Sequence, residues 1–226
     1  MARKKQTRIC GLCGALAEVT REHFVPQGLW PGPRPNRTET VPACEACNAR
    51  TNLDDEYFRN TLAMMLDLTH PHKQALFAGP VLRSLKKHPG WTKYALTRVT
   101  AQPMWGPSGL WLGNFPVLPL DIDRFQRSLL KIVKGLFFLI RKSPFPASGR
   151  IILVGQLNAR TQPLIASIEE HLFPPTFDFG DDVFEWRFSQ TTDGITMWKL
   201  MFYRCVVFYA CGFENADDLA GKGDVA

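Results

Sequence analysis

Two cysteine pairs of identical spacing are the feature that most constrains the fold of this 226-residue chain. Cys10 and Cys13 form one C-x2-C pair, and Cys44 and Cys47 form the second. A short turn of this spacing lets two thiolates reach the same ion, so two such turns supply the four ligands of a tetrahedral zinc site. We therefore expect a structural Zn²⁺ ion bound by these four cysteines.

The remaining cysteines and the lack of long apolar segments indicate the cellular compartment of the protein. Cys205 and Cys211 lie in an apolar stretch without paired spacing, and we interpret them as buried structural thiols. No apolar segment follows the basic residues 1–5, and no run has the length of a membrane span, so we expect neither a secretory signal nor contact with a membrane. In a reducing compartment, paired cysteines bind metal more often than they form disulfides.

Composition and charge narrow the possible functions. Hydrophobic residues make up 45% of the chain and charged residues 21%, which is typical of a globular protein and argues against long disordered segments. The formal net charge of +6 favours polyanionic partners such as nucleic acid, although many unrelated proteins share such an excess. Charge alone therefore permits a nucleic-acid partner without identifying one.

An acid and a histidine stand together between the two cysteine pairs. Residues 17–20 are predicted to form a short strand that carries Glu22 and His23 at its end. Neighbouring side chains in a regular strand point to opposite faces, so a shared site requires the backbone to turn after the strand. Pro26 and Gly28 are typical of such a turn.

A loop and a helix complete this N-terminal region. Residues 31–37 are rich in proline and glycine, and their Arg34 and Arg37 either contact a phosphate backbone or belong to a solvated loop. After the second cysteine pair, apolar residues recur with helical spacing. This pattern predicts a helix that begins near residue 49, is capped by Asp54 or Asp55, and runs to about residue 69.

The order of these pieces resembles the zinc-bearing branch of the HNH endonucleases. The resemblance covers about residues 8–60 and rests on three motifs: Cys-x2-Cys, Glu22-His23-x2-Pro26, and Val41-Pro42-Ala43-Cys44-x2-Cys47-Asn48. Each motif alone is common, whereas their order and nesting are specific. The resemblance implies a ββα-metal fold in which one divalent ion and one histidine hydrolyse phosphodiester bonds of DNA.

The resemblance also implies roles for individual residues. His23 matches the general base, because an imidazole titrates near neutrality and can take a proton from the attacking water. Glu22 matches the acidic ligand of a catalytic divalent cation, expected to be Mg²⁺ or another hard ion. Asn48 falls at the second ligand position, and Asn52, one helical turn later, at the third. The implied partner is double-stranded DNA, in the cytoplasm of a bacterium or of a phage-infected host cell.

The sequence departs from the family pattern at two of these positions. The middle asparagine of the family would fall near Glu39, whose carboxylate is a candidate to accept a hydrogen bond from His23. The third ligand position holds Asn52 where the family often has a histidine. Nearby acids are candidates either for the metal or for capping the helix: Asp54, Asp55 and Glu56.

The remainder of the chain is predicted to be a larger α+β domain. Proline and glycine become frequent after residue 70, so we divide the chain into a nuclease module, residues 1–69, and a second domain, residues 70–226. Strands are predicted over residues 91–100, 109–115 and 151–157, and a helix over 162–172. A C-terminal hairpin pairs residues 183–188 with 195–208 through Asp193-Gly194. The aromatic residues of this hairpin are predicted to lie in the core: Trp186, Trp198, Phe202 and Tyr203.

Residues 121–142 form the clearest predicted helix, which is amphipathic. Its apolar residues share one face, and its basic residues lie on the opposite face. The apolar set is Ile122, Phe125, Leu129, Ile132, Val133, Leu136 and Ile140, and the basic set is Arg124, Arg127, Lys131, Lys134 and Arg141. Such a basic stripe either follows nucleic-acid phosphates or is simply solvated.

Two rivals to the endonuclease hypothesis follow from the same residues. A zinc-containing module that binds nucleic acid without cutting it needs the cysteines and basic faces, but not Glu22, His23 or Asn48. A protein-interaction factor needs zinc only to fold, and it predicts no salt-dependent binding to DNA. The second domain recognises substrate, contacts a partner or braces the nuclease, and the oligomeric state is left open.

Overall fold

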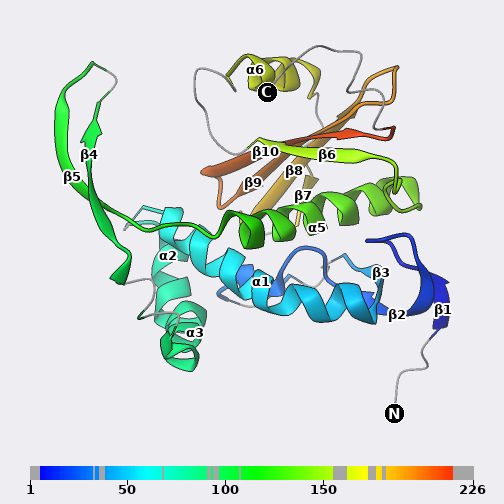
Figure 1. Cartoon of the computed structure of the whole chain (residues 1–226), viewed down its shortest axis with the longest axis horizontal. Coiled ribbons are helices and arrows are strands. Elements are labelled where there is room, and N and C mark those ends of the chain that lie inside the picture. Colours follow the sequence, from blue (N-terminus) through cyan, green and yellow to red (C-terminus); the bar gives the residue numbers. More distant parts are fainter. Residues whose placement is uncertain are drawn as a thin grey trace.

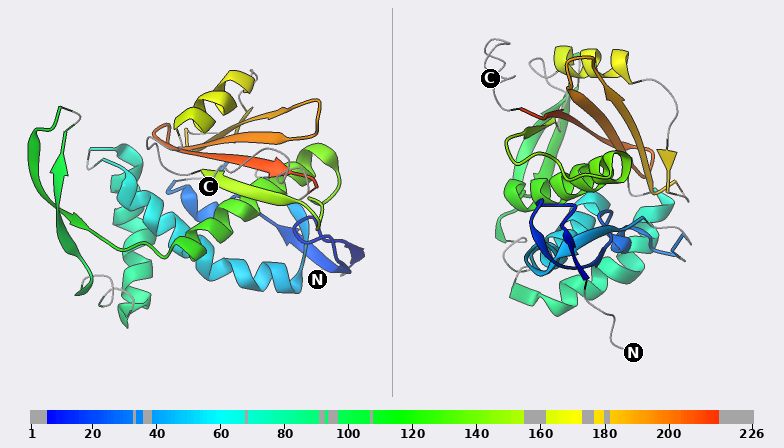
Figure 2. Two further views of the ribbon diagram at one scale, coloured as in Figure 1. Left: turned by 45° about the horizontal axis from the view of Figure 1, so that its top comes forward. Right: turned by 90° about the vertical axis from the view of Figure 1, so that its right-hand side faces the viewer.

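The structure is a computed structural model that describes residues 6–32, 34–35, 39–67, 69–90, 93, 97–106, 108–154, 162–172, 177–179 and 182–215. Its helices and sheets form the layered α+β arrangement shown in Figures 1 and 2. A five-stranded antiparallel sheet lies between two helices, α5 on one face and α6 on the other. Helix α1 and a small three-stranded sheet pack on the far side of α5. The α+β class predicted from the sequence is therefore confirmed.

The small sheet consists of β1 (Gln6–Ile9), β2 (Leu16–Glu22) and β3 (Val41–Cys44), which pair antiparallel in the order β1-β2-β3. A short 3-10 turn, η1 (Gln27–Leu29), follows β2. Helix α1 (Glu45–Met65) begins directly after β3. The strand predicted before Glu22 is confirmed, and β2, β3 and α1 follow one another as strand, strand and helix.

The predicted bounds of α1 were wrong at both ends. The helix begins at Glu45, because the preceding Cys44 has extended backbone angles and Cys47 already lies in the first helical turn. It ends at Met65. Asp54 and Asp55 therefore lie in the middle of the helix, where they cannot act as N-caps.

The described residues between 70 and 120 include short helical segments and a hairpin. Among these segments are α2 (Pro71–Leu76), the π-helical η2 (Phe77–Val81) and α3 (Leu82–Lys87). The hairpin of β4 (Thr100–Trp105) and β5 (Trp111–Val117) extends away from the body (Figures 1 and 2). It confirms the strand predicted over 109–115, whereas Lys93 and Thr97 are helical, so the strand predicted over 91–100 was wrong. No charged residue occurs from 99 to 120, so this hairpin offers no cation to a phosphate backbone.

Helix α5 (Ile122–Arg141) confirms the amphipathic helix predicted from the sequence. Asp121 caps it by accepting a hydrogen bond of 3.1 Å from the backbone N–H of Arg124. The middle of its apolar face is buried, whereas Ile122 and Ile140 near its ends are exposed. None of the described helices combines the length and apolar composition needed to cross a lipid bilayer.

The large sheet has the strand order β6-β10-β9-β8-β7. Its strands are β6 (Arg150–Val154), β7 (Phe177–Asp178), β8 (Phe184–Gln190), β9 (Thr196–Phe202) and β10 (Val206–Phe213), and α6 (Gln162–His171) covers one face (Figure 1). The helix predicted over 162–172 is confirmed. The strand predicted over 151–157 is confirmed as far as Val154, and residues 155–157 lie outside the described part.

The predicted hairpin joined by Asp193-Gly194 corresponds to β8 and β9, which pair antiparallel. The single strand predicted over residues 195–208 was wrong, because the chain reverses at Tyr203 and Arg204 and continues as β10. Both residues have left-handed backbone angles, with φ of 54° and 57°, without a glycine to signal the turn. Cys205 in this turn is exposed, contrary to prediction, whereas Cys211 is buried as predicted.

One continuous hydrophobic core joins α1, the small sheet, α5 and the inner face of the large sheet. Trp186, Trp198, Phe202 and Tyr203 are all buried in it, as predicted. A smaller cluster lies between the large sheet and α6. The proposed division after residue 69 stays a prediction, but side chains from both sides of that position share the main core.

Helix α5 lies close to the loop after β2 at Gly135. A β-carbon at this position would lie 2.2 Å from the side chain of Phe24, which is completely buried. We expect Gly135→Ala to lower the free energy of unfolding by up to about 2 kcal/mol, because an overpacking cost of about 1–3 kcal/mol opposes a gain of about 1 kcal/mol in helix propensity. Urea denaturation measures the change. In the control Gly79→Ala, the added carbon meets only the end of Arg83 at 3.7 Å. Equal stability of both variants would contradict the close approach.

Candidate metal centre and the adjacent His23 site

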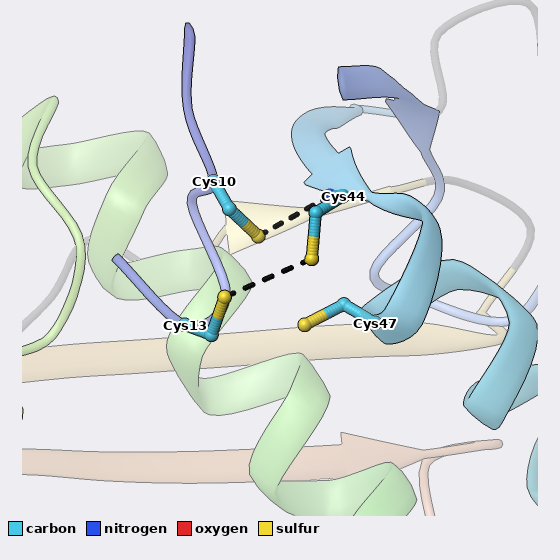
Figure 3. Close-up of side chains that lie close together, drawn as sticks. All are labelled: Cys10, Cys13, Cys44 and Cys47. Carbon is cyan, nitrogen blue, oxygen red and sulfur yellow. Dashed lines mark hydrogen bonds between the residues drawn. The ribbon is translucent and has the colours of Figure 1, made fainter. Parts of the chain in front are cut away.

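Four cysteines form a compact cluster at one end of α1 (Figure 3). The Sγ atoms of Cys10, Cys13, Cys44 and Cys47 all lie within 4.8 Å of one another. The first pair follows β1, and the second pair spans the end of β3 and the first turn of α1. The predicted four-cysteine cluster is therefore confirmed, and it could hold a metal such as zinc.

Backbone hydrogen bonds shape the two turns that carry these cysteines. Gly14 has a left-handed φ of 77° and donates its N–H to the carbonyl of Cys10 at 2.9 Å, which closes the first turn. The N–H of Gly11 donates to the carbonyl of Pro42 at 2.7 Å and so ties this turn to β3. The cluster thus joins the turn after β1 to the start of α1.

The environment of the thiols suits a bound cation. Burial acts to raise the pKa of Cys10, but backbone N–H groups, including that of Cys44, lower it to about 7. Burial raises the pKa of both Cys13 and Cys47, which disfavours their thiolates unless a cation offsets the negative charge. Four sulfur donors in one compact set match the preference of zinc.

Glu22, at the end of β2, is paired with a lysine from α5. The Nζ atom of Lys131 lies 3.1 Å from Glu22 Oε1 and 2.5 Å from Asp55 Oδ2. It also donates to the backbone carbonyl of His23 at 3.4 Å. Lys131 is only 4% exposed, so a residue predicted to contact nucleic acid is instead buried between α1, β2 and α5.

Two arginines of α5 also contact α1. Arg124 and Arg127 donate to the carboxylate of Asp54 at 3.0 and 2.7 Å. Burial acts to raise the pKa of Asp54, but the hydrogen bonds from both arginines lower it below its ordinary value. The predicted stripe is therefore not an open basic surface along these residues, because Arg124, Arg127 and Lys131 meet the acids of α1.

His23 lies directly after β2 and belongs to a polar chain with Gln27 and Arg34. The side-chain nitrogen of Gln27 is 2.8 Å from His23 Nε2, and Arg34 Nη1 donates to Gln27 Oε1 at 2.7 Å. An amide nitrogen can only donate, so His23 Nε2 accepts this bond and the ring carries its proton on Nδ1. Burial lowers the pKa of His23, the positive charges of Arg34 and Lys131 act in the same direction, and Glu22 opposes them. The arrangement favours a neutral imidazole.

The other predicted site residues take no part in the hydrogen bonds among His23, Gln27 and Arg34. Asn48 Nδ2 donates to Thr20 Oγ1 at 2.9 Å. Glu39 is exposed, and the described residues show no hydrogen bond between it and His23, whose Nδ1 is buried without a partner among them. Arg37 lies outside the described residues. The roles of Asn48 and Glu39 therefore stay predictions.

A cavity of about 360 Å³ is lined in part by Gln27, the hydrogen-bond partner of His23, whereas His23 itself does not line it. Gln27 and Asp55 line it and so connect it to the His23 and Lys131 contacts. Asn52, predicted as a metal ligand, also lines the cavity. The other lining residues include three cations, which sequence reasoning missed: Arg59, Arg83 and Lys87. The sequence could have indicated one of them, Arg59, because Asn52, Asp55 and Arg59 have the spacing of one helical face.

Comparison with protein-family models, curated proteins and solved structures found no match to this chain. The resemblance to HNH endonucleases thus rests on the motifs in the sequence alone.

Proposed function

We propose that the chain is a nuclease that cleaves phosphodiester bonds of nucleic acid, with His23 as the general base. The observation that carries this proposal is the hydrogen bond between the His23 imidazole, whose pKa is lowered by burial, and Gln27, which lines a cavity with three cations in its lining. The order of the cysteine, Glu-His and Cys-Asn motifs supports the same reaction through the resemblance to HNH endonucleases. The net charge of +6 suits a polyanionic substrate.

The chemistry follows from the side chains around the cavity. Once the Gln27 amide releases it, the lone pair of His23 Nε2 accepts a proton from the attacking water. The water oxygen then bonds to phosphorus while the bond from phosphorus to the leaving oxygen breaks, and the leaving oxygen takes a proton from solvent. Gln27, held by Arg34, orients the imidazole before substrate binds. Arg59, Arg83 and Lys87 offset negative charge on the phosphate oxygens, which increases in the transition state. Zinc in the cysteine cluster supplies structure by fixing α1 against the strands.

A catalytic divalent cation between Glu22 and Asn48 does not fit this arrangement. Such an ion binds a carboxylate oxygen at about 2.0–2.6 Å. The ammonium of Lys131 already lies 3.1 Å from Glu22 Oε1, so the two cations would repel each other at very short range. The proposed reaction therefore uses no step through Mg²⁺ at these residues.

We expect His23→Ala to lower the cleavage rate by about 100-fold or more, the range typical of a lost general base. Supercoiled plasmid and single-stranded RNA serve as substrates, and zinc content and circular dichroism verify folding. The control is His171→Ala at the exposed end of α6, which should cleave at the wild-type rate. Because the base acts when neutral and burial lowers its pKa, the rate should fall in acidic solution and reach its plateau at a lower pH than an ordinary histidine would give.

The non-catalytic alternative has an observation in its favour, since Lys131 neutralises the carboxylate that matches the family's metal ligand. In that case the wild-type protein binds DNA in a salt-dependent manner and cleaves neither substrate. Cleavage by His23→Ala at the wild-type rate would remove His23 from the mechanism. An absence of both binding and cleavage would leave the protein-interaction factor.

A further inference from the structure

The hairpin of β4 and β5 stands apart from the hydrophobic core of the described residues. Every residue of β4 is exposed, and so is every residue of β5 except Gly113, which is partly exposed. No residue of either strand belongs to the two hydrophobic clusters, and the hairpin extends away from the body (Figures 1 and 2). A two-stranded hairpin in water is only marginally stable unless something packs against it. The hairpin therefore needs contacts that the rest of the described chain does not supply.

The exposed side chains of the hairpin are large and apolar. Trp105 and Trp111 are cross-strand partners beside the turn and are 61% and 54% exposed. Met104, Phe115 and Val117 share one face, because alternate residues and cross-strand partners point to the same side. The exposed apolar residues of the hairpin are Met104, Trp105, Leu110, Trp111, Leu112, Phe115 and Val117. Their exposed area is on the order of several hundred Å², which approaches the share of about 800 Å² that one partner buries in a standard protein interface.

The charge pattern of the sequence limits what can cover this surface. Residues 99–120 are the longest stretch of the chain without a charged residue. Nucleic acid and anionic membranes are bound through lysine and arginine, and this stretch has neither. Two copies of a chain with a net charge of +6 repel each other over most of their surfaces, but no like charges meet where two such hairpins touch. In a two-fold contact the same patch must fit itself, which an uncharged apolar patch can do.

Two prolines limit how a partner can approach the hairpin. Proline in a strand is confined to positions whose N–H would point away from the paired strand. Pro103 in β4 and Pro116 in β5 both lie within the paired region. Each outer edge of the hairpin therefore lacks a hydrogen-bond donor, which disfavours the addition of another strand at either edge. A partner would pack on the faces of the hairpin instead of extending its sheet.

We infer that the β4–β5 hairpin is a dimerisation arm whose apolar faces pack against the same hairpin of a second copy of this chain. Two hairpins that pack face to face bury their large side chains in a small core, as the two sheets of a sandwich do. The inference concerns association of the protein and does not depend on whether the chain cleaves nucleic acid.

Sedimentation velocity of the full-length, zinc-loaded protein at micromolar concentration tests this inference. The wild type should sediment at twice the chain mass of 25.6 kDa. The double variant Trp105→Lys with Trp111→Lys should sediment as a monomer, with a dissociation constant raised about 100-fold or more, because it places cations of both copies in one apolar contact. The matched control, Leu16→Lys with Leu53→Lys, adds the same charge at residues that are 73% and 61% exposed outside the hairpin, and it should stay dimeric.

The substituted tryptophans belong to neither hydrophobic cluster, so circular dichroism and zinc content should match those of the wild type. A wild type that is monomeric at every concentration would overturn the inference. A monomeric wild type that also binds vesicles of phosphatidylcholine and phosphatidylglycerol would overturn it in favour of a lipid surface. A dimer that persists in the tryptophan variant would place the interface elsewhere and would equally overturn it. A dimeric wild type that cleaves no substrate would leave this inference standing while the proposed function fails.

Discussion

Replacing Cys44 and Cys47 together with serine should abolish the binding of one zinc ion per chain and unfold the region of β1, β2, β3 and the start of α1. The expected loss is large because zinc binding contributes about 10–16 kcal/mol of apparent free energy in small zinc-dependent domains. Strand β1 has little else to hold it, since every one of its residues is exposed. Cys44 is also the last residue of β3 and directly precedes α1.

Metal analysis by mass spectrometry measures the zinc content, and far-UV circular dichroism measures the lost structure. Cys205→Ser is the matched control, because Cys205 is an exposed cysteine outside the cluster and its replacement should leave zinc content unchanged. A chelator applied to the wild type should produce the same spectrum as the double variant. Zinc-free protein that keeps its native spectrum and stability would contradict a structural role for the cluster.

Local patterns in the sequence predicted the features that depend on local spacing. The C-x2-C pairs predicted the cysteine cluster, and the periodicity of residues 121–142 predicted α5. The Asp193-Gly194 turn predicted the pairing of β8 with β9. Each of these signals lies within a few residues of the structure that it determines.

The predictions that failed depend on contacts between residues far apart in the chain. Lys131 contacts Glu22, 109 positions away in the chain, and Asp55, 76 positions away. The periodicity of the α5 sequence could show only that Lys131 lies opposite the apolar face. The sequence could not reveal that a second helix covers that face with acids. The turn at Tyr203 and Arg204 was missed for another reason, because neither residue type signals a left-handed backbone. Tyr203 instead donates its buried hydroxyl to the carbonyl of Leu29, a contact across 174 positions.

Phe58→Ala should destabilise the whole chain by about 3–5 kcal/mol, the usual cost of removing a buried phenylalanine side chain. Phe58 on α1 is 0% exposed. The centre of its ring lies 4.7 Å from that of Phe125 on α5 and 5.4 Å from that of Phe202 on β9. A single side chain thus contacts the N-terminal region, the central helix and the large sheet. The control is Leu53→Ala on the same helix, whose side chain is 61% exposed and whose loss should cost less than about 0.5 kcal/mol.

The same variant tests whether the chain unfolds as one unit or as two domains divided after residue 69. Urea unfolding is followed by tryptophan fluorescence, to which the buried Trp186 and Trp198 of the large sheet contribute, and by release of zinc from the cysteine cluster. With one shared core, Phe58→Ala moves both transitions to lower urea by the same amount, because neither part keeps its packing without the other. Two independent domains would instead show zinc release at lower urea while the fluorescence transition stays in place. That outcome would mean that the contacts of Phe58 with Phe125 and Phe202 contribute little to the stability of the large sheet.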